Sequence, residues 1–392
     1  MFEKIFADKM ANLGTETAFM VLAKAKALEA QGKEIIHLEI GEPDFATPRN
    51  IIDAGIRALN EGYTHYTPAP GLPEVRATIA EYATRQKGVH YDPEEVVIVP
   101  GGKPIMFFTI LALVNPGDEV IYPNPGFPIY ESVINFVGGK AVPLPIREEN
   151  DFRLDVDELA GLITPKTKLL ILNSPANPTG GVLTAEDIGR IADLVRGKNI
   201  VVLADEIYDR IVYDGARPVS IAAQPGMKDW TIILDGFSKT YAMTGWRIGY
   251  GLMHRELADR IAQLMVNSNS CTAAFTQKAA QEALTGPQDA AEAMVAEFKK
   301  RRDIIVDGLN SIPGITCKRP LGSFYVFPNI KGLGLSSQEL EAFLMEKAGV
   351  AALSGTAFGK YGEGYLRLSY ANSVENIEKA LEKIAAAVKE LR

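Results

Sequence analysis

The sequence predicts an α/β protein with a mostly parallel sheet in a large domain and a smaller α+β domain. Between about residues 95 and 253, short runs of apolar residues alternate with stretches of helical spacing. This alternation is typical of strands that are buried on both faces and connected by helices. The remaining part of the chain has a different pattern, with a long charged helix, two strand-like runs and a final amphipathic helix. A chain of 392 residues is long enough for about two domains.

The predicted helices and strands follow one another along the chain. Residues 17–31 are rich in Ala, Leu and Lys and predict a helix that Gly32 ends, and the apolar run 35–40 predicts a strand. Helical spacing returns at 72–86 and at 103–114, and 96–99 consists of four β-formers. The further predicted strands are 168–172, 200–204, 231–234, 248–253, 321–327 and 365–370, and the further predicted helices are 294–309 and 374–391.

Composition and charge argue against several classes of partner. A net charge of −8 gives no basic surface for nucleic acid or an anionic membrane, and the longest clear apolar run, 105–114, is too short to span one. The two cysteines, Cys271 and Cys317, lack CxxC spacing, and the N-terminus shows no apolar signal segment, so a reducing, cytoplasmic location is expected. The four histidines are scattered singly, and no metal site is expected.

Tight turns and polar residues follow several of the predicted strands, where open α/β sheets bind their ligands. The turn at 100–103 leads from a strand into a helix, an arrangement in which the free amides of Gly102 and Lys103 can hold an anion. Lys239 follows the strand 231–234, where poor solvation makes its amine easier to deprotonate for attack on a carbonyl. The planar guanidinium of Arg247 can hold an anionic group nearby.

Several ordered motifs resemble one family. Ser238-Lys239 followed by MTGWRIG at 243–249, the NPTG sequence at 177–180, Asp205 with Tyr208, and Arg367 in RLSYA are similar to segments of class I/II (fold-type I) pyridoxal-phosphate (PLP) aminotransferases, which include aspartate and aromatic amino-acid aminotransferases. The similarity covers essentially the whole chain. It implies a large PLP-binding domain at 46–285 and a small domain made of 1–45 and 286–392.

The resemblance also implies roles for individual residues. Lys239 would hold PLP as a Schiff base and move the substrate proton, Asp205 would keep the ring nitrogen protonated, and Tyr208 and Asn177 would bond the ring oxygen. The ring of Phe127 would stack on the pyridine. The phosphate would be held by Gly102, Lys103, Ser238 and Arg247, with Tyr66 contributed across the interface of a homodimer. The substrate-binding residues would be Gly41, Asn177 and Arg367, the last as a clamp for the α-carboxylate.

The implied activity is transfer of an amino group from an L-amino acid to a 2-oxo acid, with 2-oxoglutarate the expected acceptor. Another PLP reaction on the same fold, such as that of a C–S β-lyase or a synthase, is the alternative, since fold and cofactor residues do not distinguish these. Some relatives carry a serine where this chain has Gly236, which would shift phosphate binding toward Ser238. The segment 263–266 holds no cation for an acidic side chain. Either another residue recognises acidic substrates, or neutral and aromatic ones are preferred.

Overall fold

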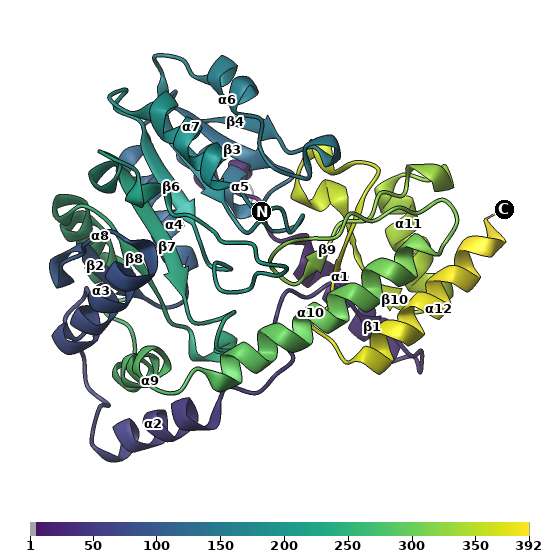
Figure 1. Ribbon diagram of the computed structural model, residues 1–392, viewed down its shortest axis with the longest axis horizontal. Coiled ribbons are helices and arrows are strands. Elements are labelled where there is room, and N and C mark those ends of the chain that lie inside the picture. The colour runs from purple at the N-terminus through teal and green to yellow at the C-terminus, as the bar shows by residue number, and fades with distance from the viewer. Residues whose placement is uncertain (1–4, 392) are drawn as a thin grey trace.

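The computed structural model describes residues 5–391 and contains a seven-stranded sheet with the strand order β2-β8-β7-β6-β5-β3-β4 (Figure 1). The five strands from β7 to β4 are parallel, and β8 runs antiparallel to both of its neighbours. The mostly parallel sheet expected from the sequence is therefore confirmed. Its strands are β2 (Val96–Val99), β3 (Glu119–Asn124), β4 (Lys140–Pro145), β5 (Thr167–Asn173), β6 (Val201–Asp205), β7 (Thr231–Gly236) and β8 (Gly249–Leu252).

Helices cover both faces of this sheet, because successive strand residues point to opposite sides. Leu169 and Ile171 of β5 pack in one apolar cluster with α4, α5 and α8, whereas Leu170 and Leu172 pack in another with α6 and α7. Residues of α3 and α9 cover the β2 and β8 end of that second face. The helices of this part are α2 (Arg49–Asn60), α3 (Pro73–Lys87), α4 (Lys103–Leu113), α5 (Ile129–Phe136), α6 (Val156–Leu162), α7 (Ala185–Val195), α8 (Arg255–Ser268) and α9 (Ala274–Thr285).

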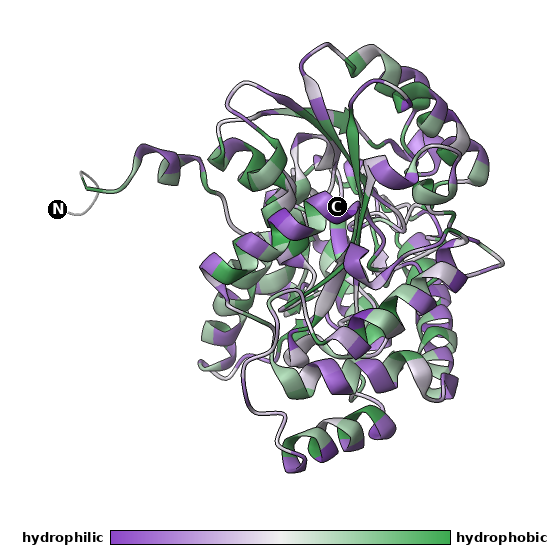
Figure 2. Cartoon of the chain, turned by 90° about the vertical axis from the view of Figure 1, so that its left-hand side faces the viewer, coloured by the Kyte–Doolittle hydropathy of each residue, from purple (hydrophilic) through white to green (hydrophobic). Residues whose placement is uncertain are grey.

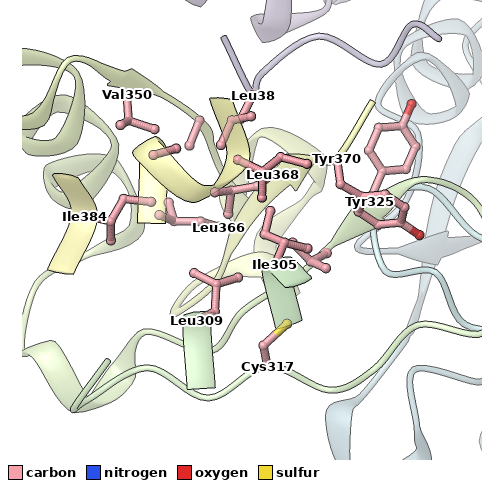
Figure 3. Close-up of a cluster of buried hydrophobic side chains, with 14 of the residues drawn as sticks. Leu38, Ile305, Leu309, Cys317, Tyr325, Val350, Leu366, Leu368, Tyr370 and Ile384 are labelled. Atoms are coloured by element: carbon pink, nitrogen blue, oxygen red, sulfur yellow. The ribbon is translucent and has the colours of Figure 1, made fainter. Parts of the chain in front are cut away.

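Beside the large sheet lies a second group of elements, to which the long helix α10 (Asp289–Asn310) leads (Figure 1). A three-stranded antiparallel sheet has the order β11-β12-β9, and β1 pairs in parallel with β10. Apolar side chains from β1, β9, β10 and β12 and from α10 and α12 form one buried cluster (Figure 3). The elements are α1 (Thr17–Glu29), β1 (Ile36–His37), β9 (Tyr325–Val326), α11 (Ser337–Phe343), β10 (Val350–Ala351), β11 (Leu353–Ser354), β12 (Leu366–Ser369) and α12 (Val374–Glu390).

Two predicted strands are much shorter than the apolar runs that predict them. The run 35–40 contributes only β1, and the run 321–327 contributes only β9. Ser323 has a φ of 59°, in the left-handed region that does not continue a strand, so the backbone turns immediately before β9. Sequence spacing also does not predict α2, β4, α6 and α7 individually.

The N-terminal segment projects from one side of the molecule (Figure 2), and it contacts α5, where Lys9 Nζ lies 5.0 Å from the ring centre of Phe136. Within its described part, residues 5–15 are exposed, including the apolar side chains of Ile5, Phe6 and Met10. Among residues 5–391, no helix is both long enough and apolar enough to cross a membrane.

Candidate active site

A cavity of about 490 Å³ opens at the carboxyl ends of β5, β6 and β7. The parallel register brings these ends together, since Asn173 pairs with Asp205, which in turn pairs with Leu234. Every site residue predicted from the sequence except Tyr66 lines this cavity, although these residues come from widely separated parts of the chain. They are Gly41, Gly102, Lys103, Phe127, Asn177, Asp205, Tyr208, Ser238, Lys239, Arg247 and Arg367.

Lys239 brings an amine with an unusually low pKa into the cavity. Burial lowers the pKa of Lys239 from 10.5 to about 8, because the charged ammonium loses its hydration. Its Nζ donates a hydrogen bond of 2.5 Å to the carbonyl oxygen of Gly41 and lies 5.7 Å from the centre of the Phe324 ring. At pH 7 about a tenth of this amine is therefore the uncharged nucleophile, far more than for a lysine with the ordinary pKa of 10.5.

Asp205 is the buried carboxylate of the cavity. Burial raises its pKa from 3.8 to about 6, even though Tyr130 donates a hydrogen bond of 2.6 Å to Oδ2 and the amide of Ile207 donates one of 3.3 Å to Oδ1. Asp205 is the last residue of β6, and the strand fixes its position in the cavity lining. A carboxylate held in this way favours a cationic or protonated group beside it.

Arg367 lies on β12 and is nearly completely buried. Its guanidinium carbon is 4.4 Å from the ring centre of Tyr325 and 4.8 Å from that of Phe358. Nη1 donates to Oδ1 of Asn177 at 3.2 Å, and Nη2 donates to the carbonyl oxygen of Glu39. The Nε of Arg367 is buried without a hydrogen-bond partner among residues 5–391. A buried donor of this kind favours an anionic ligand that could accept from it.

A second anion-binding corner lies where β2 meets α4. Gly102 and Lys103 stand at the start of α4, whose first amides have no acceptors within the helix. Gly101 has a φ of +83°, and a Cβ on it would lie 2.3 Å from Nη2 of Arg247. Glycine is therefore required for the close approach of Arg247 to this turn. Ser238 lines the same cavity and is buried.

The sequence predicts a role only for the main-chain amide of Lys103. The structure shows that its side chain also takes part in the site. Its Nζ forms an ion pair with Glu16, next to the first residue of α1, and lies 5.4 Å from the ring centre of Phe127. Both Lys103 and Glu16 line the cavity. The side chain of Lys103 is 49% exposed, so this cation is accessible at the opening of the site.

Sequence reasoning does not identify four residues that shape the cavity: Glu16, Tyr130, Tyr325 and Phe358. Tyr130 lies on α5, directly after the aromatic loop that follows β3, but nothing in the sequence indicates its bond to Asp205, 75 positions away. Tyr325 belongs to a run that reads as an ordinary strand. Each of these roles depends on a long-range contact and leaves no local motif.

Two sequence expectations concern residues outside this cavity lining. Tyr66 is 90% exposed, and its predicted contact crosses to a second chain, so its role stays a prediction. The segment 263–266 lies on α8 and contributes no residue to the lining. The lack of a cation there consequently does not decide whether acidic substrates are bound.

Comparisons with known proteins identify the family. The family model for aminotransferase class I and II matches residues 33–384. The chain is 41% identical to an aspartate aminotransferase from Pyrococcus abyssi, with 91% of this chain and 92% of that protein covered. It is 40% identical to aromatic-amino-acid aminotransferase 2 from Thermococcus litoralis, with 92% and 94% covered. The crystal structure of the aspartate aminotransferase from Rhizobium meliloti superposes with a TM-score of 0.94 at 37% identity and covers 98% of each chain.

Enzymes of this kind use PLP, and the cavity suits that cofactor. It offers a buried amine of lowered pKa for the aldehyde, a buried carboxylate for the ring nitrogen, and a helix start with Arg247 for the phosphate. The relatives also decide between the two reaction types left open by the sequence, in favour of amino-group transfer. The chain therefore belongs to the class I and II aminotransferase family and is a PLP-dependent transaminase.

Proposed function

We propose that this transaminase accepts a broad set of L-amino acids as donors and uses 2-oxoglutarate as the acceptor. The observation that carries the proposal is a pair of separate cations that line the cavity besides Lys239 and Arg247, with Arg367 deep inside and Lys103 at the opening. A dicarboxylate such as 2-oxoglutarate needs two cationic partners, whereas a neutral or aromatic amino acid needs only the first.

The ion pair of Lys103 with Glu16 does not prevent this second role. Partly exposed pairs of this type contribute about 0–1 kcal/mol, so a substrate carboxylate can replace Glu16 at small cost. With a neutral substrate the pair stays closed, and the Phe127 ring beside it offers an apolar surface. The relatives named aspartate aminotransferase and aromatic-amino-acid aminotransferase 2 support acidic and aromatic substrates on one architecture.

Each of three cavity residues has a separate role in amino transfer. PLP, when bound, supplies the electron sink that makes the α-proton of the amino acid acidic. Lys239 takes up and returns this proton at its Nζ, a role that its lowered pKa suits at neutral pH. Asp205, oriented by Tyr130, holds a proton on the cofactor's ring nitrogen, and Arg367 orients the substrate through its α-carboxylate.

The other cofactor contacts are part of the same proposal. Tyr208 and Asn177 would bond the ring oxygen, and Phe127 would pack against the ring. The anion corner of Gly102, Lys103, Ser238 and Arg247 would hold the phosphate. The lining of one cavity by all of these residues supports their roles. Gly41 contributes its carbonyl oxygen, which already accepts from Lys239.

We further propose a homodimer in which Tyr66 reaches the phosphate of the partner's cofactor. The exposure of Tyr66 in the single chain and the apolar side chains of the extended segment 5–15 support a partner surface.

The proposed large domain comprises 46–285, and the small one 1–45 with 286–392; the pairing of β1 with β10 supports this division. A cytoplasmic location is proposed on the two free cysteines.

A spectroscopic experiment tests the substrate proposal. Purified PLP-loaded protein is mixed with single amino acids without an acceptor, and conversion of the visible band ranks the donors. The converted protein is then titrated with 2-oxoglutarate or pyruvate, in wild type and in Lys103→Met. We expect Lys103→Met to raise the half-saturating concentration of 2-oxoglutarate by about twofold to fivefold, as for the loss of a half-exposed ion pair, and to leave that of pyruvate nearly unchanged.

The matched control is Lys140→Met, which removes another lysine from an ion pair with a glutamate, Glu119, away from the cavity lining. This control should leave both titrations unchanged. Equal effects of Lys103→Met on the two acceptors, or failure of 2-oxoglutarate to restore the visible band in wild type, would refute the proposal.

A further inference from the structure

Tyr325 touches three parts of the active site at once. Its hydroxyl oxygen lies 2.9 Å from that of Tyr208, and its ring lies against the guanidinium of Arg367. A Cβ on Gly41 would lie 2.0 Å from the Tyr325 hydroxyl, so this hydroxyl also packs against the backbone whose carbonyl accepts from Lys239. Tyr325 is 1% exposed and lines the cavity, yet the roles proposed above do not use it.

The fold holds this side chain in one place. Tyr325 lies on β9 and pairs with Ser369 of β12, two positions from Arg367. Its ring is 4.8 Å from that of Phe324 and 5.9 Å from that of Tyr208, edge-on to the latter. It lies at one edge of the apolar cluster of the second group of elements (Figure 3). A tyrosine held between these rings and the guanidinium of Arg367 cannot rotate away from Tyr208 without disturbing this packing.

Two buried hydroxyls at 2.9 Å can share only one hydrogen bond, so one of them donates and the other accepts. If Tyr208 donated to Tyr325, it would have no proton left for a ligand in the cavity. If Tyr325 donates, the single proton of Tyr208 is available for an acceptor in the cavity. An acceptor oxygen near Tyr208 selects the second arrangement, because the first would leave that oxygen facing a lone pair.

We propose that Tyr325 is a positioning residue for amino transfer, which donates its hydroxyl proton to Tyr208 and thereby directs the proton of Tyr208 to the ring oxygen of the cofactor. This rests on the role of Tyr208 proposed above. A phenol that accepts a hydrogen bond is also a stronger donor, because bonds in a chain polarise one another. Through its ring, the same residue supports the guanidinium of Arg367.

The sign of the expected effect follows from the charge on the ring oxygen. A donor to this oxygen draws negative charge from it and weakens its hold on the proton shared with its neighbouring nitrogen. Losing the donor, or weakening it, therefore moves the pH midpoint of the visible absorbance to higher pH. The charged groups around Tyr208, Tyr325 and Lys239 also affect this midpoint through their electrostatic field, and none of them is changed in the variants below. These groups are Asp205, Arg367, Glu16, Lys239, Glu42 and Lys103.

The experiment is a pH titration of the visible spectrum of the PLP-loaded protein in four forms: wild type, Tyr208→Phe, Tyr325→Phe and the double variant. We expect Tyr325→Phe to raise the midpoint by about 0.5 to 1 pH unit, the effect of one hydrogen bond, and Tyr208→Phe to raise it further. Because Tyr325 acts through Tyr208, the double variant should match Tyr208→Phe alone.

Two further variants separate this role from general packing. Tyr370→Phe removes the hydroxyl of another buried tyrosine in the same cluster, one that bonds Tyr213 and the carbonyl of Ser323 instead of cavity residues, and should leave the midpoint unchanged (Figure 3). Tyr325→Leu removes the ring as well. It should move the midpoint like Tyr325→Phe and also raise the half-saturating amino-acid concentration about tenfold, as for a desolvated cation–ring contact.

The outcomes distinguish this inference from the proposed function. If Tyr208→Phe moves the midpoint but Tyr325→Phe does not, the role of Tyr325 is wrong and that of Tyr208 stands. Additive displacements in the double variant would show that Tyr325 acts independently of Tyr208, which also overturns the inference. If neither variant moves the midpoint, the proposed bond of Tyr208 to the ring oxygen is wrong, and the inference falls with it.

Discussion

Replacing Asp205 by asparagine should stabilise the cofactor-free protein while it abolishes most of the activity. Asp205 is 7% exposed, and burial raises its pKa from 3.8 to about 6. The folded protein therefore holds the ionised carboxylate at a cost that the unfolded chain does not have. Asparagine carries no charge and keeps an oxygen that can accept from Tyr130.

The magnitude follows from the difference of about two between the folded and unfolded pKa values. At pH 8 the carboxyl is ionised in both states, and the cost to the folded state is about 3 kcal/mol. As the pH falls below 6, the folded carboxyl takes up a proton and the cost decreases, to about half at pH 5. Asparagine loses the bond from the Ile207 amide, which offsets about 1 kcal/mol. The net gain should be about 2 kcal/mol at pH 8 and about 0.5 kcal/mol at pH 5.

Urea denaturation of cofactor-free wild type and Asp205→Asn measures this gain, at the two pH values and at equal protomer concentration. Asp229→Asn, which removes the charge of an exposed aspartate, is the control and should show no pH-dependent gain. Added PLP should reverse the order of stability, since only the carboxylate can hold a protonated ring nitrogen. A variant less stable than wild type at pH 8, or a gain that is equal at pH 8 and pH 5, would refute the reasoning.

Three further predictions concern buried lysines. The side chain of Lys87 is 4% exposed, and its Nζ lies 2.6 Å from Glu206, 2.5 Å from Asp209 and 3.5 Å from Asp235. Lys87→Met leaves these buried carboxylates without their cation, so it should reduce the free energy of unfolding by about 3–5 kcal/mol at pH 8. A loss below about 1 kcal/mol in urea denaturation would contradict this. Lys239→Ala should abolish the visible band of bound PLP with the circular dichroism spectrum unchanged. In wild type, the rate of PLP incorporation should rise with pH to half its maximum near pH 8, the pKa of Lys239, and a midpoint near 10 would show that burial does not lower this pKa.

The large sheet is predictable from the sequence because its strands carry their own signal. Residues 96–99 and 200–204 are apolar on both faces, and a strand buried between two layers of helices requires this. The order of the strands has no such signal. β8 inserts between β2 and β7 and pairs Val99 with Gly249, 150 positions apart, so its antiparallel direction is determined by tertiary packing. For β9 the sequence predicts too long a strand. The apolar run packs in the core of the second group of elements, but only two of its residues pair with a neighbouring strand.

The candidate site divides in the same way. Residues in fixed local motifs, such as Lys239 and Asn177, are found from the sequence, because the turn that follows each strand sets their position. Tyr130, Tyr325 and Glu16 are not found, since each acts on a partner from a distant segment. The position of the Lys103 side chain is missed for a related reason: its local motif predicts the use of its amide and says nothing of its ammonium.

Because Lys239 and Asp205 are both buried, binding of the cofactor lowers the free energy of the site in two ways. Desolvation is the largest cause of both the lowered pKa of Lys239 and the raised pKa of Asp205, so the cofactor-free protein disfavours the charged form of each. A ligand that bonds the amine removes the first cost, and a protonated ring nitrogen beside the carboxylate offsets the second. The low dielectric that destabilises the separate groups strengthens their interactions once partners are present. The stability that the folded chain loses at Asp205 and Lys239 is therefore the same free energy that makes the cavity selective for a ligand with a reactive carbonyl and a basic ring nitrogen.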